Sequence, residues 1–463
     1  MADWIRHDPI VVVRGQGSWL WDSHGNRYLD GNASIWTNLH GHRHPSVDRA
    51  IHRQLSRVAH CSSLGLANGP AADLARNLVQ HANPQSLRNA RGSQSAPLQK
   101  VFYSDDGSTA IEAALKMVHV FAQRVRGHRN PRFLTVDSAY HGDTLGAVSL
   151  GHLGLFHDAF RGLLFPTGKV MSPYCYRCPF NRASPQRVDA RQSRNCQWEC
   201  VDNVARQFES ASKRRNPYAA FVVEPLVQGA AGMIGHPPGW LKRVSEIARA
   251  HEALLITDEV LSGFARASDP EEATGNPVQL LASHQEGVQP DLTALAKGLT
   301  GGYLPMAATL TTREVFDAFS GRYEDFKTFF HGHSYSGNPL GAAAAGASLE
   351  LLSRPSCARA RRRIAQSIKE ASADLWRHPQ VGDVRQIGMI LAVELVRDWK
   401  TREPWPLKAK AGIRVCREMA KLGVLTRPIG NVVVIMPPYS TRPEDAARMI
   451  ETLGRSIRRV FAP

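Results

Sequence analysis

Long apolar segments are absent from this chain. No run of 18 consecutive apolar residues occurs, which argues against a membrane-spanning helix. Residues 1–8 lack the apolar stretch of a signal peptide. We therefore expect a soluble cytoplasmic protein without a membrane partner.

Cysteine is scarce. The chain has seven cysteines in 463 residues, and in a long chain without a signal peptide an odd number favours reduced thiols. Four of them form two closely spaced pairs, Cys175 with Cys178 and Cys196 with Cys200. Such pairs can hold zinc tetrahedrally, but buried free cysteines are common. The sequence leaves structural zinc and plain thiols open.

Acidic residues are too few to balance the basic ones, 41 against 57, so the formal net charge is +16. A basic surplus suits a polyanionic partner. The basic residues are dispersed, however, apart from short clusters such as residues 361–363. Because no recognised nucleic-acid-binding motif accompanies the charge, we predict no nucleic-acid partner.

Apolar residues make up 43% of the chain, enough for two globular lobes. Strands and helices are predicted in alternation through most of the chain, and the pattern becomes α+β after about residue 340. We predict an α/β fold with a large domain at 59–340, which carries an irregular cysteine-containing insertion at 151–215. Residues 1–58 and 341–463, the two chain ends, are predicted to form a smaller α+β domain.

One lysine stands between an apolar run and a glycine turn. Residues 292–296 are largely apolar, which favours a buried strand. Lys297 then falls at the carboxyl end of this strand, where open α/β sheets bind ligands. A lysine taken out of water there shifts toward the neutral amine, which can form a Schiff base with an aldehyde cofactor. Alone, this tripeptide of Ala, Lys and Gly also fits a surface lysine in a loop.

A second buried strand is predicted at residues 253–258, which are mostly apolar until the chain reaches Asp258. A buried carboxylate needs a partner, and a protonated pyridine nitrogen would be one. On this segment alone, Asp258 fits a helix cap equally well.

A strand, a glycine turn and a helix are predicted in succession between residues 101 and 123. Gly107 permits close backbone approach, and the hydroxyl of Ser108 can donate to a phosphate at the helix N-terminus. Ser108 also fits a simple helix N-cap. The combination predicts an anion site at the start of the helix.

Two aromatic residues are candidates for pocket lining. Tyr140 follows the predicted strand 133–137 and precedes a His-Gly pair, so its ring can stack on a flat ligand. Trp36 fits either pocket lining or ordinary core.

Taken together, the DDGS turn at residues 105–108, the YHG triplet, the strand LLITDEV and the segment ALAKGLTGG resemble the class III pyridoxal-phosphate aminotransferases. Each motif alone is weak, whereas four in this order are specific. The resemblance implies fold type I, pyridoxal 5'-phosphate as cofactor, and a homodimer with active sites at the subunit interface.

Several segments are most similar to the branch of this class that acts in biotin biosynthesis. They are SIWTNLHGHRHP, AYHGDT, VEPLVQGAAGM, KGLTGGYLPMAATLTT, HGHSYSGNPL and TRPIGNVVVIMPP. This likeness runs from about Gly15 to the C-terminus and implies transamination of a keto acid, 8-amino-7-oxononanoate, to 7,8-diaminononanoate. The implied amino donor is S-adenosylmethionine or lysine. The alternative is another class III ω-aminotransferase, acting on 4-aminobutyrate, ornithine or a diamine.

The resemblance assigns roles position by position. Lys297 would bind the cofactor covalently and move the proton, and Asp258 would keep the pyridine nitrogen protonated. Tyr140 would stack on the ring and line the substrate pocket, and Arg427 would bind the far carboxylate of the substrate. The remaining implied assignments are Gly107 and Ser108 to the phosphate, His333 and Ser334 to the phosphate of the neighbouring subunit, Ile35, Trp36 and Gly332 to the substrate, and Glu224 with Arg266 to a supporting ion pair.

Three departures from the family pattern affect the substrate side. Trp4 and His7 are poor substitutes for the N-terminal Trp-His-Pro-aromatic-Thr motif. Residues 35–36 are Ile-Trp where some members have two tryptophans, and Val434 replaces a tyrosine. The segment GFARASDPEEATGNPVQLLASH replaces the compact GFGRTG loop. A non-catalytic cofactor-binding protein is thus a further alternative, against which the retained motifs argue.

Overall fold

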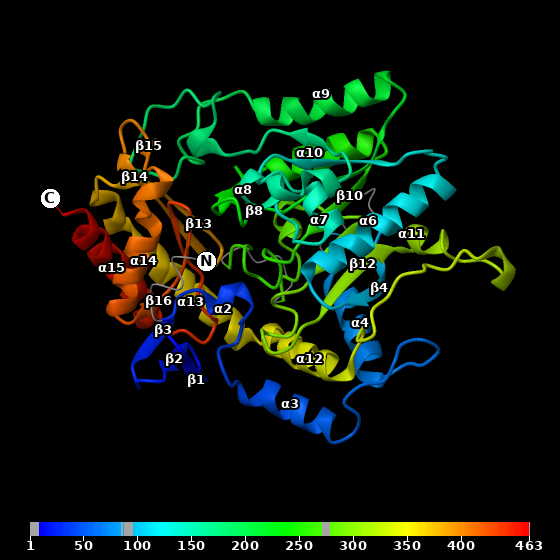
Figure 1. Cartoon of the computed structure of the whole chain (residues 1–463), viewed down its shortest axis with the longest axis horizontal. Coiled ribbons are helices and arrows are strands. Elements are labelled where there is room, and N and C mark those ends of the chain that lie inside the picture. Colours follow the sequence, from blue (N-terminus) through cyan, green and yellow to red (C-terminus); the bar gives the residue numbers. More distant parts are fainter. Residues whose placement is uncertain (1–8, 85–86, 88–95, 271–277, 463) are drawn as a thin grey trace.

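The computed structural model describes residues 9–84, 87, 96–270 and 278–462 of the chain (Figure 1). Trp4, His7 and part of the altered loop after Arg266 lie outside the described residues. Seven strands form the central sheet. Their order is β4 (Leu98–Ser104), β12 (Ala307–Thr312), β11 (Leu292–Leu295), β10 (Leu254–Asp258), β7 (Tyr218–Val223), β5 (Arg132–Val136) and β6 (Gly168–Val170).

The central sheet is mixed, because β12 runs antiparallel to both of its neighbours. Strands β11, β10, β7, β5 and β6 pair in parallel, so their carboxyl ends meet at one edge. Strands β7, β10 and β11 are buried along their whole length, as the apolar runs predict. The predicted α/β architecture with a large mixed sheet is confirmed.

Helices cover both faces of this sheet. On one face, α6 (Gly107–Arg124) packs apolar residues such as Ile111 and Ala114 against β7, β10 and β11. On the other face, α9 (Glu199–Lys213) and α10 (Trp240–Ala250) pack Phe208 and Trp240 against the sheet. The other helices and turns of this part are α3 (Pro45–Leu55), α4 (Gly69–His81), α7 (Leu145–Leu150), α8 (Gly154–His157), α11 (Arg313–Asp317) and α12 (Pro339–Ser353).

Helix α6 begins two residues earlier than the sequence predicts. The Asp106 carboxylate accepts a hydrogen bond from the backbone N–H of Thr109 at 2.9 Å, and the Thr109 hydroxyl oxygen accepts from the Asp106 N–H. This reciprocal capping box makes Asp106 the N-cap. The alternative role of Ser108 as N-cap is therefore wrong.

Segments from both chain ends pair with each other. Strands β1 (Val12–Gln16), β2 (Trp19–Asp22) and β3 (Arg27–Asp30) pair antiparallel in this order, and β16 (Val424–Leu425) pairs in parallel with β3. The sequence predicts a strand pair at residues 424–427 and 432–436. In the structure, β16 pairs with β3 instead, and the short β17 (Pro428–Ile429) pairs with β18 (Val432–Ile435).

The C-terminal helices gather at one end of the molecule beside the N-terminal strands (Figure 1). They are α13 (Pro355–Ser372), α14 (Ala411–Lys421) and α15 (Pro443–Phe461), beside a sheet that also contains β13 (Val381–Ile387), β14 (Ile390–Asp398) and β15 (Glu403–Pro404). None of the described helices has the length and apolar character that crossing a bilayer requires. The domain boundaries at residues 58 and 340 stay predictions.

The insertion at 151–215 is more regular than predicted. It supplies the edge strand β6 and the 15-residue helix α9. Its cysteines Cys175, Cys178, Cys196 and Cys200 are free thiols. Throughout the described ranges, no three metal-ligating side chains are arranged to hold an ion, so the zinc interpretation finds no support here.

Candidate active site

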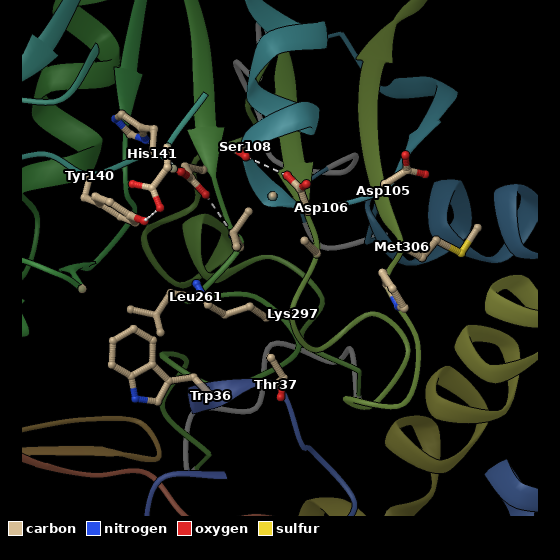
Figure 2. A pocket seen from close by; sticks show the side chains of 18 of the residues that line it. Trp36, Thr37, Asp105, Asp106, Ser108, Tyr140, His141, Leu261, Lys297 and Met306 are labelled. Atoms are coloured by element: carbon tan, nitrogen blue, oxygen red, sulfur yellow. Dashed lines mark hydrogen bonds and ion pairs between the residues drawn. The ribbon is translucent and has the colours of Figure 1, made fainter. Parts of the chain in front are cut away.

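A cavity of about 520 Å³ lies at the carboxyl ends of β10 and β11, beside the amino end of α6 (Figure 2). Seven residues predicted from the sequence line this one cavity: Trp36, Gly107, Ser108, Tyr140, Glu224, Asp258 and Lys297. Other lining residues include Thr37, Asp105, Asp106, His141, Tyr303 and Met306. The sheet edge therefore gathers side chains that are far apart in the sequence.

Lys297 follows β11 and extends into the cavity, with Trp36 on one side (Figure 2). Its Nζ lies 5.5 Å from the centre of the Trp36 ring. Burial lowers the pKa of the Lys297 amine, while the carboxylates of Asp258 and Glu224 oppose this shift. The amine is therefore closer to its neutral, nucleophilic form than a surface lysine would be.

Asp258 ends β10 and forms a buried pair with His141. Nδ1 of His141 lies 2.8 Å from Oδ2 of Asp258. Burial opposes a charge on His141, but the hydrogen bond and charge of Asp258 outweigh it, so the pKa of His141 is raised. The other Asp258 oxygen accepts from the N–H of Val260 at 3.0 Å, within a turn. The helix-cap alternative for Asp258 is therefore wrong.

Glu224 is a second buried carboxyl group in the cavity wall. It accepts hydrogen bonds from the backbone N–H groups of Tyr140, at 3.2 Å, and Gly229, at 2.8 Å. Burial raises the pKa of Glu224 from 4.5 to about 7, because it outweighs the charge of His141 and the two backbone hydrogen bonds, which favour the ionised form. The carboxyl group thus titrates near neutral pH.

The predicted ion pair between Glu224 and Arg266 is wrong. The buried guanidinium of Arg266 donates instead to the carbonyl oxygens of Asn38, at 2.6 Å, and Pro437, at 2.7 Å. It also lies 4.8 Å from the ring centre of Tyr439. Arg266 therefore joins an N-terminal segment to a C-terminal one.

Replacing Glu224 by glutamine should change the pH dependence of stability. The folded-state pKa lies above the ordinary value, so ionisation costs folded-state stability as pH rises from about 4.5 and the full cost is reached above about pH 7. Relative to wild type, Glu224→Gln should gain about 2 to 3 kcal/mol of unfolding free energy between about pH 5 and pH 8. Urea unfolding of both proteins at the two pH values measures this difference. An equal difference at both would contradict the raised pKa.

The amino end of α6 forms a cradle of backbone groups. A Cβ on Gly107 would come within 2.8 Å of the Val260 side chain, and Gly142, with φ of +120°, packs against Ser108. The Ser108 hydroxyl donates to Asp106 at 2.7 Å. The N–H groups of the first helical turn and the helix dipole make this cradle suited to an anion.

Tyr140 is held by contacts on several sides. Its hydroxyl donates to Asp143 at 3.0 Å. Its ring is parallel to that of His157, with centres 6.1 Å apart, and meets the edge of Phe156. The ring is thus fixed in the wall of the cavity.

The Trp36 wall has an unusual backbone. The four-residue turn α2 (Ala33–Trp36) has φ values of 45°, 50°, 58° and 74° in sequence order, so all four residues are left-handed. This conformation costs an L residue roughly 1–2 kcal/mol. Because none of these four residues is glycine, contacts with neighbouring groups must hold the left-handed backbone in place.

The family model described as aminotransferase class-III matches residues 1–457. The chain belongs to the class III aminotransferases. It is 45% identical to the adenosylmethionine-8-amino-7-oxononanoate aminotransferase of Geobacter sulfurreducens, over 99% of this chain and 94% of that protein. The enzyme of the same name from Aquifex aeolicus is 39% identical over 99% and 94%.

Solved structures agree with this class III assignment. The adenosylmethionine-8-amino-7-oxononanoate aminotransferase of Methanocaldococcus jannaschii has a TM-score of 0.85 and 32% identity, covering 99% of this chain and 95% of that one. A PLP-bound amine transaminase from an uncultivated Pseudomonas species has a TM-score of 0.85 and 31% identity, covering 98% and 96%. The chain therefore has the fold of the pyridoxal-phosphate-dependent aminotransferases.

Besides Arg266, five residues that the class III resemblance assigns do not line the cavity within the described chain. Ile35 is 41% exposed, and Arg427 is exposed between β16 and β17. Gly332, His333 and Ser334 lie in the loop before α12, where Nδ1 of His333 is 3.0 Å from Asp105. Their assigned roles stay predictions.

His141 is the main residue whose role the sequence analysis missed in this class III site. Its only signal is its position beside Tyr140, shortly after a predicted strand. Thr37, Tyr303 and Met306 also line the cavity, and no chemical pattern in the sequence marks them.

Proposed function

We propose that this chain transfers an amino group to 8-amino-7-oxononanoate, giving 7,8-diaminononanoate in biotin biosynthesis, with pyridoxal 5'-phosphate as cofactor. One observation carries the proposal. The buried amine of Lys297, the Asp258–His141 pair and the anion cradle at Gly107 converge on a single cavity. Relatives that are 39–45% identical over nearly the whole chain bear the corresponding name.

The cavity residues fit this cofactor. Gly107, Ser108 and Gly142 line the cavity at the amino end of α6, where the backbone N–H groups of the first helical turn would hold the phosphate. Asp258 would bind the ring nitrogen, Tyr140 would lie on the ring face, and Lys297 would carry the covalent link. When bound, pyridoxal phosphate supplies an electron-withdrawing ring that stabilises negative charge at the substrate carbon.

Side chains of the protein would then transfer the substrate proton and stabilise charge in the cavity. Lys297, whose pKa burial lowers, can accept a proton at Nζ from the substrate carbon and return it. Asp258 keeps its carboxylate directed by the hydrogen bond from His141. Trp36 and Tyr140 form two walls of the cavity around the reacting atoms.

We propose S-adenosylmethionine as the amino donor, because the similar relatives are named for it. The test adds S-adenosylmethionine, lysine, 4-aminobutyrate and 7,8-diaminononanoate separately to the cofactor-loaded enzyme and follows formation of the pyridoxamine form by absorbance. Conversion by 7,8-diaminononanoate and S-adenosylmethionine supports the proposal. Conversion by lysine and not by S-adenosylmethionine would make lysine the amino donor. Conversion by 4-aminobutyrate alone would favour the ω-aminotransferase alternative.

We also propose a homodimer that works in the cytoplasm. Large apolar side chains are uncovered in the single chain, including Tyr323, Leu64 and Phe330, which are 91%, 90% and 74% exposed. A second copy would cover such residues and would bring His333 and Ser334 to the phosphate of its neighbour. Light scattering of the purified enzyme tests the subunit number.

Arg427 should determine affinity for the keto acid. Its exposed guanidinium would bind the far carboxylate, and a hydrogen bond to a charged group contributes roughly 1.5–3 kcal/mol. Arg427→Ala should therefore raise KM for 8-amino-7-oxononanoate about 10- to 100-fold, with little loss of cofactor. Steady-state kinetics measure the effect, and Arg362→Ala, an exposed arginine of α13, is the matched control. An unchanged KM would contradict the role given to Arg427 in binding the keto acid.

A further inference from the structure

A buried carboxylate lies directly under the left-handed turn of residues 33–36. Asp30, at the end of β3, is 2% exposed. It accepts from the backbone N–H groups of Asn32, at 3.2 Å, and Ser34, at 3.1 Å, and from the Ser34 hydroxyl at 3.4 Å. These donors all belong to the turn or its entry.

His42 supports the same carboxylate from the other side. Its Nε2 lies 2.9 Å from Oδ2 of Asp30. Its Nδ1 lies 3.1 Å from the amide nitrogen of Asn38, which can donate to it. This pattern fits the tautomer in which Nε2 carries the proton and donates to Asp30. The chain on both sides of residues 33–36 is thus tied to one acid.

The turn carries a wall of the active site. Trp36 and Thr37 line the cavity, and the Trp36 ring lies 5.5 Å from Nζ of Lys297 (Figure 2). Because four successive L residues are left-handed there, the backbone would relax to a right-handed or extended form without its hydrogen-bond acceptor. Such a change would move Trp36 and leave Lys297 and Asp258 in place, since these follow β11 and β10.

We propose that Asp30 and His42 are positioning residues for substrate binding, which act by holding the left-handed turn and so the Trp36 wall. The inference rests on the proposed function for the identity of the substrate. It does not depend on which amine the enzyme accepts, because the wall faces the reacting lysine in either case.

The test compares wild type with Asp30→Asn in the cofactor-loaded enzyme. Asparagine keeps the size of the side chain but cannot accept from all of the donors. KM for the keto acid and for the amine should rise about tenfold, while kcat changes less than about threefold and the absorbance of the bound cofactor is unchanged. Asp73→Asn, which alters an exposed carboxylate of α4, is the control.

Glycine at residue 33 provides the decisive second measurement. Glycine adopts positive φ without the penalty of a Cβ, so Ala33→Gly in the Asp30→Asn background should recover most of the lost affinity. A merely structural role for Asp30 predicts no such rescue. The single Ala33→Gly variant completes the double-mutant cycle.

Several outcomes would overturn the proposal: an unchanged KM in folded Asp30→Asn, parallel loss of kcat and cofactor absorbance, or no rescue by Ala33→Gly. If Asp30→Asn does not fold, His42→Leu, which removes only one contact to Asp30, carries the same test with a smaller rise in KM. Should wild type fail to use 8-amino-7-oxononanoate, the proposed function fails, and the same comparison with an amine that it does accept still decides the role of Asp30.

Discussion

Replacing Lys297 by alanine should reduce transamination by at least about 10³-fold, because the variant would lose both proposed roles of this lysine, covalent attachment of the cofactor and proton transfer. The fold should be retained, since the lysine side chain extends into a cavity and supports no part of the core. The assay is kcat/KM with the keto acid and the preferred amine.

A matched control separates this effect from the loss of any lysine. Lys213→Ala removes an exposed lysine near the end of α9 and should leave the rate unchanged. Borohydride reduction followed by mass spectrometry should attach the cofactor at residue 297 in wild type and in Lys213→Ala only. A Lys297→Ala enzyme that kept a tenth of wild-type activity would contradict every catalytic role given to this lysine.

Replacing Asp258 by asparagine should lower kcat about 10²- to 10³-fold. An amide cannot hold a positive charge on the ring nitrogen of the proposed cofactor, so the ring would withdraw electrons less strongly. Separately, the variant loses the charged partner of His141, 2.8 Å away, which should lower folding stability by roughly 3–5 kcal/mol. Rates at saturating substrate measure the loss.

The pKa of His141 offers an independent measure of the same change. In Asp258→Asn, His141 would lose the carboxylate that stabilises its charged form, while burial would still oppose that charge. The pKa of His141 should therefore fall. NMR titration of the histidines detects the shift. Asp317→Asn, an exposed position of α11, is the control for both measurements. Full activity in Asp258→Asn would show that the carboxylate is dispensable.

The central sheet and the main site residues could be predicted because their signals are local. Buried parallel strands have nearly continuous apolar sequences, and the residue that follows each apolar run lies at the ligand-binding edge of the sheet. Lys297 and Asp258 both follow from this rule. The cradle at Gly107 follows from a strand, a glycine and a helix in succession.

The parts that were missed depend on contacts between distant segments. Nothing in Ala33 to Trp36 indicates left-handed backbone, because the usual marker is glycine and the acid that holds the turn precedes it. The partner of β16 is β3, nearly the whole chain away. Arg266 donates hydrogen bonds to two backbone carbonyl oxygens and does not pair with Glu224. Only the three-dimensional arrangement determines which acceptor this guanidinium reaches.

The pairing of β3 with β16 bears on how the enzyme is made in the cell. Gly31, next to Asp30, exchanges backbone hydrogen bonds with Leu425 and Met436, and the Leu39 carbonyl accepts from Tyr439. A ribosome delivers these C-terminal partners last, at roughly 5–20 residues per second. During synthesis β3 can pair with β2, but its other edge stays uncovered until residues 424–439 have been translated, so the segment that leads to Trp36 lacks these contacts until then.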